Sequence, residues 1–260
     1  MKTRFVAALL ALLLMLSLAA CGETEVASVL EQAAEAGISL GEPGEEDDTP
    51  GEVPQCVQDL SEEENALLNG EWKDGVYLNE YFGYRFSLPE GGTMTRLHDE
   101  ATEWTEPVSL AACYEGKEGG LIFWADIPDL DGFVMIGVQA RKDEEFGLDE
   151  EALVEKNIRD IWDINKLFGE DRGPELGTAV FAGEEHPASI QTSEISSGTQ
   201  NMIDLYIPKG DFLYLVTITV NNGEWEPLLA LFDKARARRT CSHNFKTADA
   251  YSKRQPFLHV

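Results

Sequence analysis

One cysteine near the amino terminus stands where the sequence could support covalent chemistry. Cys21 follows an apolar run from Phe5 to Leu18 that only Ser17 interrupts, and Lys2 and Arg4 form a basic start. The fourteen residues of the run are too few for a stable helix across a hydrocarbon core of about 30 Å. A basic start before a short apolar segment is typical of an export signal.

The residues around Cys21 refine this prediction. Leu18-Ala19-Ala20-Cys21-Gly22 resembles the signal of bacterial lipoproteins, in which small residues precede an obligatory cysteine. The resemblance implies cleavage between Ala20 and Cys21, diacylglycerol on the Cys21 sulfur, and lipid anchoring on the extracytoplasmic face of the cell membrane. Two or more acyl chains hold a protein where one binds reversibly. The alternative is an ordinary secretory signal in which Cys21 is incidental.

The histidines and serines form no recognisable catalytic pattern. His186 lies in Gly-Glu-Glu-His-Pro, which predicts a polar turn between two strands, and His98 is expected in an exposed loop. A general base needs an oriented nucleophile and an acidic partner. The nearby serines (Ser189, Ser193, Ser196 and Ser197) are not in a Gly-x-Ser-x-Gly elbow. We therefore expect no catalytic residue.

Metal and cofactor sites are also not expected. Zinc sites usually contain close pairs of ligands, which His98, His186, His243 and His259 do not form. The acids before Gly132 (Asp126, Asp129 and Asp131) lack the register of a calcium loop, so a solvated hairpin turn is expected there. In so acidic a chain, adjacent pairs such as Glu144-Glu145 and Glu184-Glu185 are expected on a solvated face.

Three cysteines remain besides Cys21. Cys56 precedes the expected domain, Cys113 lies in a stretch of uncertain type, and Cys241 is near the end. Export permits disulfides, but an odd number leaves at least one thiol unpaired within a monomer. A bridge between Cys113 and Cys241 and a buried, inert Cys113 are both open.

The elements that would position these residues occupy only part of the 260-residue chain, which has a net charge of −28. This charge argues against nucleic acid as a partner, because phosphate binding needs clustered Lys and Arg. Residues 22–70 contain fourteen acidic residues and no Lys or Arg. This composition predicts a largely disordered tether over 21–70. Two short helices are possible within it, at Val26–Ala36 and at Ser61–Leu68, and the second begins with a capping box at Ser61.

Residues 71–240 have the pattern of a folded domain. Apolar residues alternate around Tyr84–Leu88, Leu121–Ala125, Phe133–Ala140, Ile203–Ile207 and Phe212–Val220, which predicts strands joined as hairpins. A turn is expected at Ile207-Pro208-Lys209-Gly210. Helical spacing predicts helices over Leu148–Phe168, capped by Asp149, and over Trp225–Phe232. The expected fold class is α+β, an antiparallel sheet flanked by two or three helices.

One segment of the domain is similar to a known family. Tyr77-Leu78-Asn79-Glu80-Tyr81-Phe82-Gly83-Tyr84-Arg85-Phe86-Ser87-Leu88-Pro89-Glu90-Gly91 resembles the opening hairpin of PsbP/Mog1-like domains, especially those of Clostridia-type lipoproteins. Gly92 stands where those domains usually have Trp. The hairpin from Met202 to Val220 is similar to the carboxyl half of that fold. The resemblance covers roughly 71–235 and implies an antiparallel sandwich used for binding or assembly.

The carboxyl end reverses the sign of the charge. From Asp233 to Val260 the chain has seven basic and two acidic residues, and residues 241–260 are expected to form a disordered tail. Binding to anionic lipid or cell-wall polymer and docking on the acidic domain are the alternatives. We expect a non-enzymatic binding module, anchored in membrane lipid through Cys21, for an envelope protein partner. An extracellular hydrolase with acidic residues in a cleft and a solute-binding lipoprotein are the alternatives.

Overall fold

Two antiparallel sheets form the framework of the protein. The computed structural model describes residues 52–96, 109–116, 119–167 and 172–235. The smaller sheet has the order β1-β2-β3-β11 and the larger one β4-β5-β6-β10-β9-β8-β7. The strands are β1 (Glu71–Lys73), β2 (Val76–Asn79), β3 (Tyr84–Ser87), β4 (Thr93–Arg96), β5 (Leu121–Ile127), β6 (Gly132–Ala140), β7 (Glu175–Phe181), β8 (Glu184–Ile195), β9 (Gly198–Lys209), β10 (Phe212–Asn221) and β11 (Phe232–Lys234).

The core lies between the two sheets. On β10, alternate residues from Phe212 to Val220 are buried, as period-two alternation predicts. Aromatic rings from both sheets pack against them: Tyr84 lies 5.5 Å from Tyr214, and Tyr77 lies 4.8 Å from Phe123, between ring centroids. Such offset and edge-to-face pairs add to the stabilisation from burial. The expected α+β class with antiparallel sheets is confirmed.

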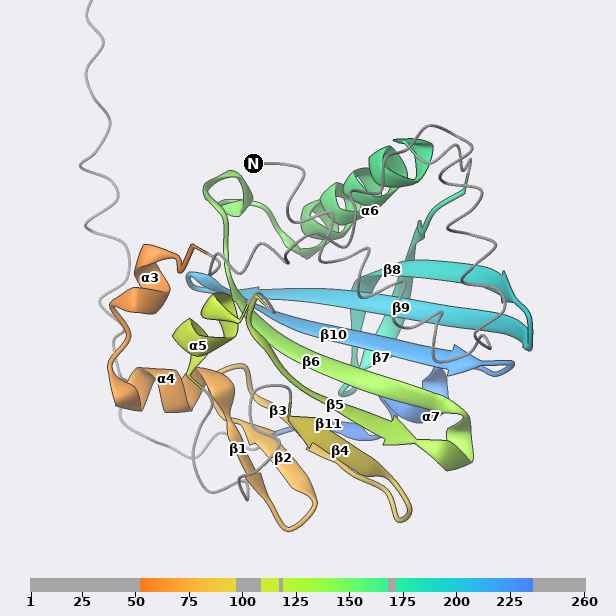
Figure 1. The fold of residues 1–260 in the computed structure, drawn as a ribbon, viewed down its shortest axis with the longest axis horizontal. Coiled ribbons are helices and arrows are strands. Elements are labelled where there is room, and N and C mark those ends of the chain that lie inside the picture. The colour runs from red at the N-terminus through yellow and green to blue at the C-terminus, as the bar shows by residue number, and fades with distance from the viewer. Residues whose placement is uncertain (1–51, 97–108, 117–118, 168–171, 236–260) are drawn as a thin grey trace, which may run out of the picture.

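Helix α6 (Glu150–Leu167) covers the other face of the larger sheet, over β7, β8 and β9. Figure 1 shows α6 on one side of this sheet and the smaller sheet on the other. The Asp149 carboxylate accepts a hydrogen bond from the backbone N–H of Ala152 at 3.0 Å, which confirms the expected cap. Of the buried side chains, Ile161 lies eight residues after Leu153 and seven after Val154, which is about two helical turns, so all three are on one side of the helix.

The packed region begins earlier than we expected. Residues 52–70, assigned above to the tether, contain the helices α3 (Gln55–Gln58) and α4 (Glu62–Asn69). Val57 and Leu68 are buried in the core, so the two helices pack on the domain. The capping box of Ser61 and Glu64 is confirmed. Acidic composition alone misses this packing because only a few apolar side chains produce it.

Two features of the carboxyl half correct the sequence prediction. The expected turn at Pro208-Lys209 lies instead at Gly210-Asp211, because β9 continues to Lys209 and Gly210 has a φ of +59°. The expected closing helix is only the turn α7 (Glu226–Leu229), with Pro227 in it, and Phe232 belongs to β11. After α7 the chain does not continue as a helix. It extends as β11, which pairs with β3 from Phe232 opposite Phe86 to Lys234 opposite Tyr84.

Short helical elements complete the described part: α5 (Leu110–Glu115), η1 (Pro128–Leu130) and η2 (Asp143–Glu145). Several predictions fall outside the described residues, namely those on Cys21, Val26–Ala36, His98, Cys241 and the basic tail. Within the described ranges, no helix is both long and apolar enough to span a membrane.

Candidate binding site

Sheet edges are where a β protein can bind an extended chain, because the edge strand has N–H and C=O groups that point away from its partner. Three of the four edges here are short and polar. β1 and β11 have three residues each and exposed charges, such as Glu71 and Lys234, and the four-residue β4 exposes Thr93 and Thr95. Short, charged or polar strands are the usual protection against unwanted pairing.

The fourth edge, β7, lacks this protection. It has seven residues, and in the described part of the chain it pairs only with β8. Leu176 is 44% exposed and Val180 is 62% exposed, and both are among the few large apolar side chains that face solvent. The only charged residue of β7 is Glu175 at its start.

Local sequence explains why β7 forms at this edge. Ala179 and Phe181 are buried on the core side, and Phe181 packs on Tyr84 and Phe232 at centroid distances of 4.8 Å. The two-residue turn Ala182-Gly183 then leads into β8, with φ values of +49° and +83°. Positive φ at both positions matches the twist of a tight hairpin.

A pocket of about 390 Å³ lies beside the carboxyl-terminal half of β7 and its turn. One wall is formed by β7 and its turn, with Thr178, Ala179, Val180, Ala182 and Gly183. Successive side chains of a strand point to opposite faces. Three consecutive residues can therefore line one hollow only if the strand's backbone edge faces it.

The opposite wall is apolar and comes from α7 and β11. It contains Trp225, Glu226, Leu229, Ala230 and Phe232. Figure 1 shows α7 beside β7, and the two elements are in contact. Leu229 and Phe232 are anchored in the core. We call the pocket together with the exposed side of β7 the β7 groove.

Ion pairs fix the wall that β11 provides. Arg85 on β3 contacts Asp233 at 2.7 Å, and Lys234 contacts Glu184 on β8. The Lys234 ammonium donates a hydrogen bond to Glu184 and lowers the pKa of that carboxyl. Each exposed pair adds little stability. The Arg85–Asp233 pair joins two strands of the smaller sheet, and the Lys234–Glu184 pair connects β11 to β8 of the larger sheet.

The charge around the β7 groove is acidic. Glu175, Glu185 and Glu226 are exposed on β7, β8 and α7, and Glu184 is engaged by Lys234. Across residues 71–232 the chain has 32 acidic and 11 basic residues, a difference of −21. The field at this edge therefore favours cationic partners.

His186 does not lie in a polar turn, which corrects the prediction. It belongs to β8, is only 6% exposed, and its Nδ1 is 2.8 Å from the Glu150 carboxylate. The prediction failed because the turn is completed by Ala182-Gly183, before the two glutamates. The pairing of Ala179 with His186 places this histidine beside β7. Burial and the Glu150 contact give it a structural role.

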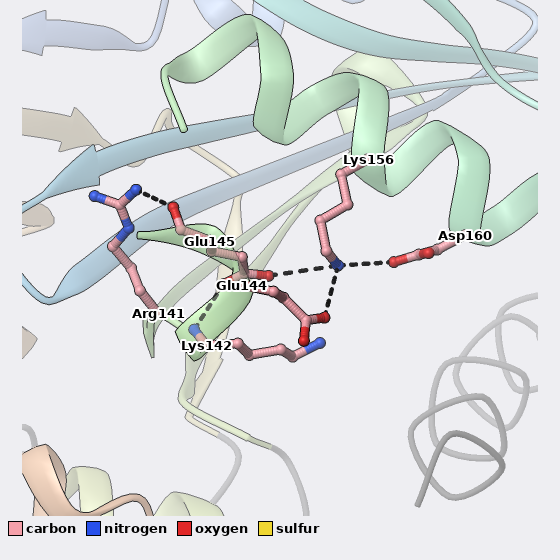
Figure 2. A network of polar contacts seen from close by, with 6 residues as sticks. All are labelled: Arg141, Lys142, Glu144, Glu145, Lys156 and Asp160. Atoms are coloured by element: carbon pink, nitrogen blue, oxygen red, sulfur yellow. Dashed lines mark hydrogen bonds and ion pairs between the residues drawn. The ribbon is translucent and has the colours of Figure 1, made fainter. Parts of the chain in front are cut away.

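A second polar cluster joins α6 to the end of β6 (Figure 2). Lys156 contacts Asp160 at 2.9 Å, Glu144 at 3.5 Å and Glu145 at 3.7 Å. Desolvation alone would lower the pKa of Lys156, but the hydrogen bond to Asp160 and the three carboxylate charges outweigh it and raise the pKa.

Glu145 in this cluster corrects the expectation of a solvated acidic pair. Its side chain is buried, and it accepts a hydrogen bond from the backbone N–H of Lys142 at 2.9 Å. Arg141 donates to the carbonyl oxygens of Glu145 and of Leu148, the latter at 3.1 Å. The cluster therefore fixes the loop before α6. Glu144 and the pair Glu184-Glu185 do remain at the surface.

Asp204 is the one deeply buried carboxyl among the described residues with a raised pKa. It lies on the β9 face under α6, and Thr217 donates a hydrogen bond to it at 2.5 Å. Desolvation raises the pKa of Asp204 to about 6, against the lowering effect of Thr217. Among residues 52–235, the ranges that are described contain no His/Cys/Asp/Glu cluster that could hold a metal ion.

The other predicted residues have these positions. Asp126, Asp129 and Asp131 surround the β5–β6 hairpin turn, as expected. Cys113 is buried, with its Sγ 3.5 Å from the Leu121 carbonyl oxygen. Cys56, expected in the tether, is half-buried in α3, and burial raises the pKa of its thiol.

The groove residues themselves were not predicted from sequence. The available signal was the alternation of Ala179 and Phe181, then Ala182-Gly183, then the alternation of His186 and Ala188. Pro187 and the two glutamates weaken that pattern. An edge also cannot be recognised before the strand order is known.

Comparisons with known proteins found no family model and no curated protein that matches the chain, whereas several solved structures do match. The solution structure of cyanobacterial PsbP (CyanoP) from Synechocystis sp. PCC 6803 is 12% identical, with a TM-score of 0.39, over 61% of this chain and 91% of that one. A crystal structure from Bacteroides thetaiotaomicron VPI-5482 is 11% identical, with a TM-score of 0.37, over 65% of this chain and 49% of that one.

Proposed function

We propose that this protein is a membrane-anchored extracytoplasmic lipoprotein that acts as a binding module for an envelope protein. The observation that carries the binding role is the β7 groove, where the long apolar edge of β7 faces a pocket. An exposed sheet edge with side-chain pockets beside it is a recurring binding site for an extended segment of a partner protein. The anchor rests on the sequence around Cys21.

Geometry favours binding over catalysis at this groove. Its walls are backbone edge and apolar side chains, and Glu226 is the only ionisable residue among those that line it. Two buried ionisable groups outside the groove, His186 and Asp204, are used inside the fold, in contacts with Glu150 and Thr217. Such a groove can hold a partner, and the anchor would keep it at the membrane surface.

The anchor is tested by Cys21→Ser, with Cys56→Ser as the matched control because Cys56 lies outside the signal. Full-length chains are expressed in a bacterium with lipoprotein processing, and membrane and soluble fractions are compared. We expect the parent chain and Cys56→Ser in membranes, with a lipidated Cys21 by mass spectrometry. The unprocessed Cys21→Ser chain should lack the lipid. An unlipidated mature parent chain would contradict the proposal.

The binding role is tested by cross-linking on intact cells, with the chain carrying a photoreactive residue at Thr178 in the β7 groove or at Leu167 at the end of α6. We expect one defined adduct from position 178 and no such adduct from position 167. Identical products from the two positions, or none from either, would contradict the proposed site.

A further inference from the structure

We propose that the β7 groove binds an extended, basic peptide segment of its partner by strand addition, with the peptide pairing to β7 as an eighth strand of the larger sheet. This inference rests on the proposed function and specifies the chemistry of the partner. Strand addition uses main-chain hydrogen bonds for affinity and pockets for alternate side chains for specificity.

The outer edge of β7 has backbone groups that can pair with a peptide. β7 is the last strand of its sheet, and no backbone hydrogen bond beyond the β7–β8 ladder involves it in the described part of the chain. Every second residue of an edge strand has its N–H and C=O pointing outward. Seven residues offer enough of these groups for one peptide strand of ordinary length.

The side chains give the second step. Leu176, Thr178 and Val180 are on the same face of the sheet as α6. Paired residues lie on one face, and Leu176 pairs with Ser189, which in turn pairs with Asp204 under α6. A strand added to β7 would place one alternate set of side chains beside Leu176 and Val180. The other set would enter the pocket against Trp225 and Leu229. The pocket favours apolar side chains in this second set, whereas the first set lies on the exposed face, where Glu185 is paired with Val180.

Charge decides between a second copy and a different partner. Pairing of two copies along β7 would bring together two surfaces of net negative charge, because Glu175, Glu185 and Glu226 are exposed on each copy, and this repulsion opposes association. A basic peptide would meet the same carboxylates with opposite charge. The occupant is therefore a peptide that alternates apolar and basic residues.

The test uses a labelled peptide of alternating lysine and valine, equal in length to β7, titrated into the purified full-length chain at low salt. An otherwise identical peptide with glutamate in place of lysine tests the charge. Two further peptides test strand addition. Each is methylated on alternate backbone nitrogens, one on the odd and one on the even positions, so that the peptide that presents the methylated edge to β7 cannot donate main-chain hydrogen bonds to it. We expect binding of the lysine peptide only. Equal binding of the methylated peptides would overturn strand addition, and equal binding of the glutamate peptide would overturn charge selection.

The site is tested by Val180→Lys, because a lysine on an edge strand blocks pairing and repels the peptide. The matched control is Leu167→Lys, which makes the same charge change at a side chain that is 78% exposed at the end of α6. We expect an increase in Kd of about tenfold or more for Val180→Lys and no change for Leu167→Lys. Equal effects of both would overturn the proposed position. Circular dichroism checks that each variant is folded.

The outcomes separate this inference from the proposed function. If Val180→Lys still forms the adduct on cells, and none of the peptides binds the parent chain, the protein is a binding module that does not use strand addition. If the lysine peptide binds but no adduct forms on cells, strand addition holds in vitro and the proposed envelope partner is wrong. Both proposals are supported if Val180→Lys loses both peptide binding and the adduct on cells while Leu167→Lys keeps both.

Discussion

At the scale of single residues, the polar groups of this protein divide into those that stabilise the fold and those that face the groove. Asn79 and Tyr77 hold the end of α4, while Lys156 and Glu145 hold the start of α6. Asp204 differs from them, because in the described part of the chain its burial is compensated by one hydrogen bond, from Thr217. Burying a charge with so little compensation costs stability.

We predict that Asp204→Asn stabilises the protein at pH 7 and has little effect near pH 4. The pKa of Asp204 is about 6 in the folded state, above the 3.8 of an unperturbed aspartate, so the folded state binds the proton more tightly. Wild-type stability should fall as pH rises from about 4 to about 6, by about 3 kcal/mol for a shift of about two units. Asparagine avoids this loss because it does not titrate.

Urea unfolding of both proteins at a series of pH values measures the effect. Asp126→Asn, at an exposed position on β5, is the control for removing a carboxylate. The interpretation of Asp204 is wrong if the difference between Asp204→Asn and wild type does not grow between pH 4 and pH 7.

At the scale of elements, the clearest tertiary joint connects α4 to the β2–β3 hairpin. The Asn79 amide donates to the Leu68 carbonyl oxygen at 2.7 Å and to the Tyr77 hydroxyl at 3.1 Å. Its carbonyl oxygen accepts from the backbone N–H of Phe82 at 3.0 Å. All of these groups are buried, so they depend on one another for hydrogen bonds.

We therefore predict that Asn79→Ala lowers the free energy of unfolding by about 2–4 kcal/mol, because it leaves buried groups without partners. Gln58→Ala is the matched control: its side-chain amide also donates to a carbonyl oxygen, that of Val53, but on the surface. Its effect should be within about 0.5 kcal/mol. Chemical denaturation measures both, and equal losses would show that Asn79 is not a buried joint.

The elements that sequence predicts well are those with an uninterrupted period. β10 alternates from Phe212 to Val220 without a break, and α6 repeats its apolar residues at helical spacing from Leu153 to Ile161. β7 was not predicted, because Gly177 and Thr178 dilute its pattern and its place at an edge is set by non-local pairing. α3 and α4 were missed as packed elements because their few apolar residues, such as Val57 and Leu68, lie in an acidic segment.

At the scale of the whole molecule, charge is the dominant feature. The chain has a net charge of −28, and the cations of the described part mostly serve internal contacts such as Arg85–Asp233 and Lys234–Glu184. Excess charge of one sign keeps a protein soluble but opposes its compact state. The same field favours basic partners at the β7 groove.

We predict that added NaCl raises the midpoint of thermal unfolding of the full-length chain by about 2–5 °C between low and physiological ionic strength, because it screens this repulsion. Calorimetry measures the midpoint. Salt should weaken the binding of the lysine peptide over the same range. A midpoint that falls with salt would show that attractive ion pairs outweigh the repulsion.

Hydrogen exchange on the full-length chain, with and without the lysine and valine peptide, tests the β7 groove most directly. We expect bound peptide to slow exchange at alternate amides of β7 and to leave exchange unchanged at β4, the other edge of the same sheet. Unchanged β7 amides with bound peptide, or equal protection of β4, would contradict it.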